Sequence, residues 1–352
     1  MSKDRQEAIQ RLSADIRPLP DGEPFHVGVY QPADGPGVAR LFYTVYGDGY
    51  PIDTFYIPER LTEENLAGRI RSVVARTDGG QVVSHIAFYR SSPPNPNLYE
   101  YGLGLTLPSY RRTLAFARCN QLLLSQVGTG GIDAFYGEAV CNHIITQKLT
   151  RMSKALETAL APALMPAEAY EAEQSAAGRV SCILAFRIVK DNPRTLYFPA
   201  CYGEALKSLA EGLCLDRRWI PGDDASADGC DGEIEVKRFD FAGAARCTIS
   251  GSMENLGGRI RELERDLKRD NFALIQFFVD LGKPWSGKIV QQLRQEGFYL
   301  GGLLPLWFGD DGLLMQKNYT DPGFDAMQIY SERGRSLRDM VQADWARAGL
   351  AR

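Results

Sequence analysis

Residues 98–150 read LYEYGLGLTLPSYRRTLAFARCNQLLLSQVGTGGIDAFYGEAVCNHIITQKLT. The pattern predicts a strand over 98–107, then a Pro-Ser-Tyr turn with two arginines and a helix over about 111–126. A glycine-rich turn leads to a second strand over 132–140 and a second helix that opens at Asn142, a residue type favoured as N-cap. The stretch is therefore one β-α-β-α unit.

The turn between the first strand and the first helix has the chemistry of an anion site. Arg111 and Arg112 supply positive charge. The first backbone N–H groups of a helix lack intrahelical acceptors and lie at the positive end of its dipole. A phosphate group is the ligand that this arrangement favours.

Composition limits the classes of function. The 352 residues are 44% hydrophobic, which suits about two globular domains, and the net charge of −4 argues against a large nucleic-acid footprint. No run approaches the roughly 18 apolar residues of a membrane span, and the N-terminus lacks the apolar core of a signal peptide. We expect a cytoplasmic protein with no membrane or nucleic-acid partner.

Cysteine and histidine usage gives no support to a metal site. The seven cysteines are scattered without a CxxC pair, and the three histidines lie far apart in sequence. We expect reduced thiols and no metal.

The flanking regions define the expected domains. Residues 1–25 are expected to form an arm with a short helix and no function. Helices are expected from about Asp34 and over about 62–71, and Thr77-Asp-Gly-Gly predicts a hairpin between two strands. An Ala/Pro/Glu-rich stretch covers 161–178, a strand follows it, and the polar turn at 190–194 is the expected domain boundary.

The second half, residues 195–320, repeats the order of strand, helix and strands without a detectable residue repeat. Asp310-Asp-Gly312 is interpreted as hairpin chemistry and not as a metal site. Residues 321–352 are expected to hold a C-terminal helix from about Asp325.

This order of elements, with a positively charged turn after the fourth strand, resembles the GNAT N-acyltransferase superfamily. The blocks that carry the resemblance are YGDGYP at 46–51, YRR at 110–112, and GEAVCNH at 137–143. The fold implied is α/β (α+β), with a mixed, mostly antiparallel sheet flanked by helices. It would be a tandem protein, with one GNAT-like domain over 26–190 and a degenerate second one over 195–320.

The resemblance implies acetyl-CoA or another acyl-CoA as co-substrate, with the pyrophosphate on the turn after the fourth strand. The family motif Arg/Gln-x-x-Gly-x-Gly/Ala falls on Arg112 to Ala117, and Ala115 replaces the first glycine. Alanine leaves the N–H donors free but narrows the approach of the phosphates. The implied cofactor-binding positions are Leu105, Leu107, Arg111, Arg112, Thr113, Leu114, Ala115, Phe116, Ala117 and Asn142.

Two glutamates interrupt apolar strands and are the candidates for the general base, Glu138 and Glu100. The alternative is that one or both pair with a neighbouring arginine or tyrosine, or face water. The family's acid, a tyrosine in the helix after the fifth strand, has no match here. Its substitutes are Tyr136, Tyr110 or His143, and the alternative is that the low pKa of the CoA thiol makes an acid unnecessary.

An aromatic loop follows the first helix of the domain and is implied to form one wall of the acceptor site. Its aromatic residues are Tyr43, Tyr46, Tyr50, Phe55 and Tyr56, of which the last four are the expected substrate-binding residues. Some of these rings must lie in the core. Their density suggests a pocket for an apolar or amphipathic acceptor, with packing against the second half as the alternative. Cys141 is interpreted as a buried structural thiol, with a nucleophile as the alternative.

Three functions remain open at this point. The first is an N-acyltransferase that moves an acyl group from acyl-CoA directly to a small-molecule amine. The second is a non-catalytic acyl-CoA-binding scaffold. The third is an acyltransferase with a non-CoA thioester or aminoacyl donor. A homodimer is left open.

Overall fold

The computed structural model describes residues 2–166, 178–222, 232–251, 253 and 255–350. The chain divides into two compact units. The first unit comprises Met1–Ser92 and Tyr99–Phe135, and the second comprises Pro93–Leu98 and Tyr136–Arg352. The boundary expected at 190–194 lies inside the second unit, so these units differ from the domains expected from the sequence, which stay a prediction.

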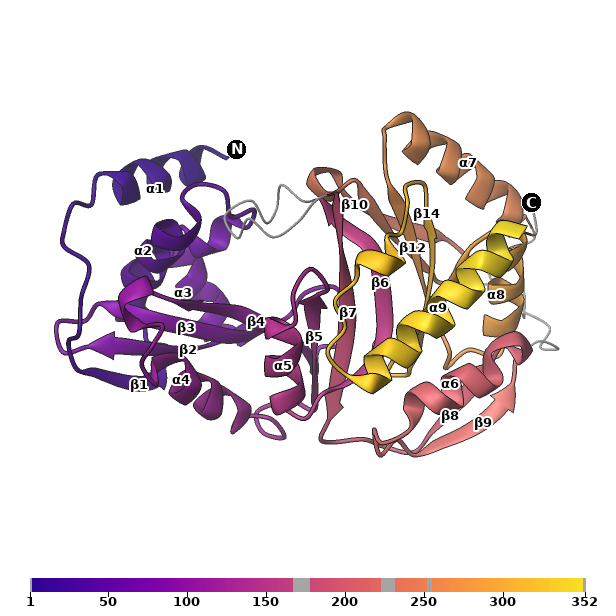
Figure 1. The fold of residues 1–352 in the computed structure, drawn as a ribbon, viewed down its shortest axis with the longest axis horizontal. Coiled ribbons are helices and arrows are strands. Elements are labelled where there is room, and N and C mark those ends of the chain that lie inside the picture. Colours follow the sequence, from indigo (N-terminus) through magenta and orange to yellow (C-terminus); the bar gives the residue numbers. More distant parts are fainter. Residues whose placement is uncertain (1, 167–177, 223–231, 252, 254, 351–352) are drawn as a thin grey trace. The chain divides into compact units, whose positions relative to one another are not determined.

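The first unit is an antiparallel sheet in the order β1-β2-β3-β4 with helices packed around it (Figure 1). Its elements are α1 (Lys3–Ser13), β1 (Phe25–Val29), α2 (Gly35–Tyr46), α3 (Pro58–Leu66), β2 (Ile70–Thr77), β3 (Val82–Tyr89), β4 (Leu98–Thr106) and α4 (Ala115–Leu124). Short 3-10 helices cover Pro32–Asp34, Asp53–Phe55 and Pro108–Tyr110.

Local signals explain several of these elements. In α2, Val38, Leu41 and Phe42 recur at helical spacing and are buried. The helix ends at Gly47, whose φ of +59° is costly for other residues and whose N–H donates to the Tyr43 carbonyl. The hairpin expected at Thr77 joins β2 to β3, and the Gly80 N–H closes its turn on the Thr77 carbonyl at 2.9 Å.

The second unit contains a large sheet in the order β5-β7-β6-β13-β14-β12-β11-β10 and a parallel pair, β8-β9. Its first elements are β5 (Ala134–Val140, shared with the first unit), α5 (Ile145–Met152), β6 (Leu156–Pro166), β7 (Arg179–Ile188), β8 (Arg194–Phe198), α6 (Gly203–Ala210) and β9 (Arg217–Pro221). The later ones are β10 (Ile234–Phe239), β11 (Ala244–Ile249), α7 (Leu256–Arg269), β12 (Leu274–Asp280), α8 (Ser286–Gln295), β13 (Tyr299–Leu304), β14 (Gly312–Asn318) and α9 (Glu332–Leu350). Short 3-10 helices cover Ala200–Tyr202, Asp240–Ala242 and Phe324–Ala326.

A duplicated module is visible within the second unit. The chain runs β5-α5-β6-β7 and later β12-α8-β13-β14, and in both cases the last strand lies between the first two in the sheet. The two modules meet where β6 pairs with β13 at Ala159 and Gly302. A Cβ on Gly302 would lie 2.2 Å from the Thr158 carbonyl oxygen, so this junction requires glycine. The expected tandem arrangement and the mixed, mostly antiparallel α/β fold are confirmed.

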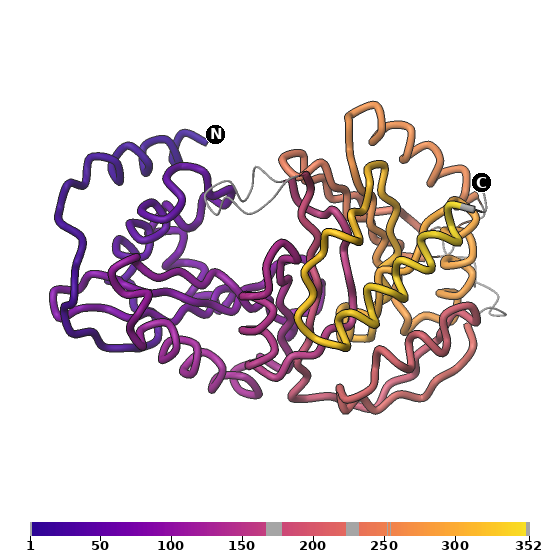
Figure 2. The backbone as a smooth tube through the Cα atoms, viewed as in Figure 1, coloured from indigo at the N-terminus to yellow at the C-terminus, as the bar shows by residue number. Residues whose placement is uncertain are grey.

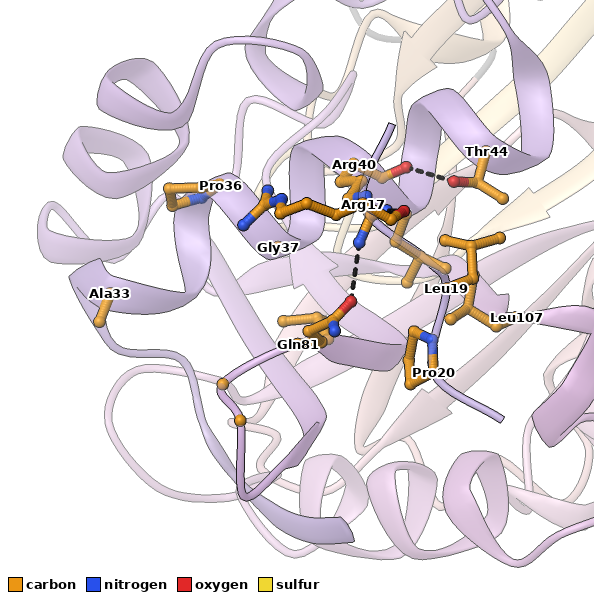
Figure 3. Close-up of a pocket in the computed structure, with 14 residues that line it drawn as sticks. Arg17, Leu19, Pro20, Ala33, Pro36, Gly37, Arg40, Thr44, Gln81 and Leu107 are labelled. Carbon is orange, nitrogen blue, oxygen red and sulfur yellow. Dashed lines mark hydrogen bonds between the residues drawn. The ribbon is translucent and has the colours of Figure 1, made fainter. Parts of the chain in front are cut away.

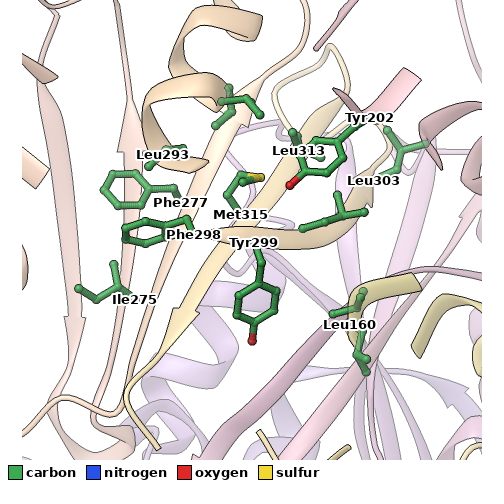
Figure 4. Close-up of a cluster of buried hydrophobic side chains, with 14 of the residues drawn as sticks. Leu160, Tyr202, Ile275, Phe277, Leu293, Phe298, Tyr299, Leu303, Leu313 and Met315 are labelled. Atoms are coloured by element: carbon green, nitrogen blue, oxygen red, sulfur yellow. The ribbon is translucent and has the colours of Figure 1, made fainter. Parts of the chain in front are cut away.

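Side chains from both modules form one core in the second unit (Figure 4). Leu160 comes from β6, whereas Phe277, Phe298 and Leu313 come from β12, the segment before β13, and β14. Helix α9 covers this sheet and contacts β13 and β6 (Figure 2). Burial of this apolar surface is the main source of the unit's stability.

Several expected boundaries are wrong. Helix α3 begins at Pro58 instead of Thr62, because proline at the first helical position loses no hydrogen bond. Helix α4 begins at Ala115 instead of Arg111, after a 3-10 turn and a further turn. The Ala/Pro/Glu-rich stretch noted at 161–178 begins inside a buried strand, β6, with Pro162 in an interruption of the β6–β7 register, and its residues 167–177 lie outside the described part of the chain.

Candidate functional site

A bulge in β4 lies at the centre of the candidate site in the first unit. The pairing of β3 with β4 shifts register between His85 and Ala87, and Leu103 has a φ of +58°. Burial lowers the pKa of His85 to about 4, so the ring is neutral at pH 7. The Leu103 carbonyl lies 2.8 Å from Nδ1 and can only accept; Nδ1–H therefore donates to it, and Nε2 accepts from the Ser72 hydroxyl at 3.0 Å. This fully buried histidine fixes the bulge.

The turn after β4 has the features of an anion site. Arg111 and Arg112 are exposed and make no ion pair within the described ranges. The backbone N–H groups of Leu114, Phe116 and Ala117 likewise find no acceptor among the described residues. Positive charge and unpaired donors therefore meet at the first turn of α4.

One part of the expected cradle is wrong. The Ala115 N–H is not free, because it donates to the Thr113 hydroxyl oxygen at 3.1 Å. That bond caps the turn internally and removes one of the donors expected for a phosphate. Leu105 and Leu107 are buried, and the Leu107 N–H is bonded to the Val83 carbonyl at 2.9 Å.

Glu100 lies on β4 directly opposite Tyr89 of β3, and the Tyr89 hydroxyl donates a hydrogen bond to its carboxylate. Tyr50 is close enough for the charge on Glu100 to affect it. Burial first, and then the neighbouring Tyr46 and Glu100, raise the pKa of Tyr50, so its hydroxyl stays protonated at neutral pH. Two tyrosines, Tyr89 and Tyr50, are therefore among the neighbours of Glu100.

The aromatic loop divides between core and surface. Phe55 and Tyr56 are buried, and the Tyr56 hydroxyl donates to the Gly47 carbonyl at 2.8 Å, so these two rings are structural. Tyr46 is 37% exposed and Tyr50 is half-buried, with ring centroids 5.1 Å apart. Of the four residues expected to bind the acceptor substrate, only these two are exposed enough to contact it.

The other expected catalytic residues belong to the second unit. The Glu138 carboxylate forms an ion pair with Arg246 of β11, with 2.9 Å between Oε1 and Nη2. The Tyr136 ring is fully buried and stacks on Phe186 at 5.3 Å, packing also against Trp307. The alternative of an arginine partner for Glu138 is thus observed, and Tyr136 is a core residue.

Asn142 does not cap the helix after β5. Helix α5 begins three residues later, at Ile145, with Ile144 at the N-cap position and no side-chain cap. The loop from β5 to α5 is fixed instead by Gln147, whose side-chain amide donates to the carbonyls of Val140 at 3.0 Å and Gln328 at 2.8 Å. The group that holds this loop is a side chain inside the helix, so the residue type before the helix did not indicate where the helix begins.

Cys141 is a buried thiol, and burial raises its pKa to about 12. Little thiolate is therefore present near pH 7. We expect iodoacetamide to modify native Cys141 far more slowly than the exposed Cys214, as followed by peptide mass spectrometry, with both reacting after denaturation. Equal native rates would restore the nucleophile hypothesis.

A pocket of about 180 Å³ lies in the first unit between the connector after α1, helix α2 and the β2–β3 hairpin (Figure 3). Ligand pockets usually measure about 300–1,000 Å³. Its two guanidinium groups already have partners: Arg17 Nε donates to Asp15 at 2.8 Å, and Arg40 Nη1 donates to Gln81 at 2.7 Å. Hydrogen bonds from Arg17 lower the pKa of Asp15 to about 2. This pocket is therefore not assigned to the co-substrate.

The described residues contain no group of three or more His, Cys, Asp or Glu placed to hold a metal ion. Across the same residues, none of the helices combines the length and the apolar character needed to cross a membrane.

Comparisons with known proteins give similarity at the level of solved structures. No family model and no curated protein matches the chain. The ribosomal-protein-S18-alanine N-acetyltransferase from Escherichia coli aligns with 50% of this chain and 100% of its own, at 12% identity and a TM-score of 0.37. An acetyltransferase of the GNAT family from Staphylococcus aureus Mu50 aligns with 47% and 100%, at 14% identity and a TM-score of 0.34. An N-acetyltransferase from the same organism aligns with 48% and 100%, at 10% identity and a TM-score of 0.39. Structures of the superfamily expected from the sequence are thus among those to which the chain is similar.

Proposed function

We propose that the first unit binds an acyl-CoA, acetyl-CoA in the first instance, and transfers its acyl group to the amine of a small molecule. The observation that carries the proposal is the β4–α4 junction. There a bulged strand is followed, after the 3-10 helix Pro108–Tyr110, by the exposed Arg111 and Arg112. Next come backbone donors of Leu114, Phe116 and Ala117 that have no acceptor in the described structure. These groups suit the phosphates of CoA.

The chemistry assigns Glu100 as the general base. It takes one proton from the acceptor ammonium, and the neutral amine attacks the thioester carbonyl. A C–N bond forms, the C–S bond breaks, and CoA leaves as a thiolate, which takes the second proton of the nitrogen. Glu100 is chosen over Glu138 because the Glu138 carboxylate is committed to Arg246, whereas Glu100 has neutral tyrosines beside it.

The test is a calorimetric titration with acetyl-CoA, CoA and a longer acyl-CoA. We expect the double variant Arg111→Ala/Arg112→Ala to weaken acetyl-CoA binding by about tenfold or more, because two phosphate-directed charges are lost, and we expect the wild-type affinity to fall with added salt. Arg11→Ala, which removes an exposed arginine of α1, is the control. Absence of binding to every CoA ester, or equal affinity in the double variant, contradicts the proposal.

The non-catalytic scaffold is kept as the second candidate because two of the three residues expected to act in catalysis, Glu138 and Tyr136, are occupied structurally. Release of the CoA thiol from acetyl-CoA in the presence of an amine separates the two. Binding without amine-dependent thiol release favours the scaffold.

A further inference from the structure

Arg5, on the N-terminal helix α1, is buried in the first unit although the sequence assigns no function to this arm. Only 8% of its side chain is exposed. Nη2 donates to the carbonyls of Asp48 and Tyr50, each at 2.6 Å, and Nη1 donates to the Asp53 carboxylate at 2.9 Å. The guanidinium group also lies over the aromatic face of Tyr56, with 4.9 Å between its central carbon and the ring centroid.

These contacts determine the shape of residues 47–53, the segment of the aromatic loop that follows α2 and carries Tyr50. The loop contains no helix or strand before the 3-10 helix at Asp53. Besides Arg5, Ser2 of the α1 N-cap donates from its hydroxyl to the other oxygen of Asp53 at 2.7 Å. Hydrogen bonds from Ser2 and Arg5 lower the pKa of Asp53, so it is charged at neutral pH. On the buried side of this segment, the hydroxyl oxygen of Tyr56 accepts a hydrogen bond from the Tyr50 N–H at 2.9 Å.

Tyr50 is thus held through its backbone on both sides. Its carbonyl accepts from Arg5 and its N–H donates to Tyr56, while its ring packs 5.1 Å from Phe42 and 5.6 Å from Phe55 between centroids. The same ring lies within the electrostatic influence of Glu100. No other arginine among the described residues of α1 contacts this loop.

We propose that α1 is a positioning element of the acceptor side, and that Arg5 is its positioning residue, which sets the Tyr46–Tyr50 pair beside Glu100 for an amine carried on an apolar or aromatic group. The inference rests on the proposed function for the identity of the reaction, but the placement of the loop by Arg5 does not. A planar guanidinium suits this role, since one group reaches two carbonyls and a carboxylate, whereas an ammonium cannot span the same fork.

The test compares Arg5→Met and Arg5→Lys with Arg11→Met, a matched control on the exposed side of the same helix. Hydrogen exchange of the amides in 47–53 is expected to accelerate in Arg5→Met, less in Arg5→Lys, and not in Arg11→Met. With phenethylamine as the probe acceptor, KM for the amine is expected to rise about tenfold in Arg5→Met, while the Kd for acetyl-CoA stays within about twofold.

The outcomes separate the inference from the proposed function. Unchanged exchange of 47–53 in Arg5→Met overturns the positioning role. If Arg5→Met raises the KM for the amine and the Kd for acetyl-CoA by the same factor, the positioning role is also overturned, because equal effects indicate general damage to the unit. A wild-type chain that binds acetyl-CoA but does not acetylate phenethylamine overturns the assignment of the acceptor class. Failure of the wild type to bind any CoA ester removes the proposed function, and the exchange result still decides the role of Arg5.

Discussion

Replacing Arg217 with methionine is expected to lower the free energy of unfolding of the second unit by about 3–5 kcal/mol. The Arg217 side chain, on β9, is 1% exposed, and so is that of Asp311, which precedes β14. Nε donates to Asp311 at 2.6 Å, and Nη1 donates to Asp191 at 2.7 Å. Asp311 also accepts from the Leu306 N–H at 2.9 Å. Methionine would leave the buried Asp311 carboxylate without its cation, whereas Asp191 would keep its ion pair with Arg194 at 2.8 Å.

Arg218→Met is the matched control, since this neighbouring side chain on the same strand is exposed and forms no ion pair within the described structure. Denaturant unfolding at pH 7 gives the comparison, and a loss below about 1 kcal/mol for Arg217→Met would contradict the expectation. Should that variant not fold, Arg217→Lys keeps the charge but not the forked donor, and an intermediate loss is expected.

The same network gives the stability a dependence on pH. Burial by itself raises the pKa of Asp191, but hydrogen bonds from Arg217 and from the Asp216 N–H outweigh it, and the net pKa is lowered. A lowered folded-state pKa contributes stability above the ordinary value of about 3.9, and that contribution is lost as the pH falls through the folded-state pKa. The difference between wild type and Arg217→Met should therefore shrink below about pH 4.

The parts of the fold that could be predicted are those with local signals. The hairpin at Thr77 has turn chemistry, and β4, its turn and β5 alternate between apolar runs and glycine or proline. Strand β6 has no such signal: it is rich in alanine and contains proline, and it is a strand because β7 and β13 pair with it. The duplicated module is likewise a property of strand order and not of residue identity.

The candidate site was only partly predictable, because the partners of its residues are distant in sequence. Arg246 is 108 positions from Glu138, and nothing in the sequence near either residue indicates the pair. Arg5 reaches a loop more than 40 positions away; a single arginine on a short polar helix carries no signal for such a contact. An aromatic residue in the sequence predicts burial in the core and ligand binding equally well. Only the structure shows that Tyr46 and Tyr50 are partly exposed, whereas Tyr56 and Tyr136 are buried.

Changing Glu100 to glutamine is expected to lower kcat for amine acetylation by about 10²- to 10⁴-fold, the usual contribution of a general base. Glutamine keeps the size of the side chain and can still accept from the Tyr89 hydroxyl. The Kd for acetyl-CoA should therefore stay unchanged, because the phosphate contacts proposed at Arg111 and Arg112 are untouched. Thiol release with phenethylamine gives kcat, and calorimetry gives Kd.

The variant Glu138→Gln tests whether the loss of kcat is specific to Glu100. When the Glu138 charge is lost, Arg246 still donates from Nε to the side-chain oxygen of Gln276 at 3.3 Å. Because both side chains of the ion pair are less than one-fifth exposed, the expected effect is a loss of about 1–3 kcal/mol in unfolding free energy with kcat retained. A large fall in kcat for Glu138→Gln alone would move the base to β5. If neither glutamine variant slows thiol release, neither carboxylate is the base. The neutral amine must then come from proton transfer to water or from the fraction of the amine that is already unprotonated in solution.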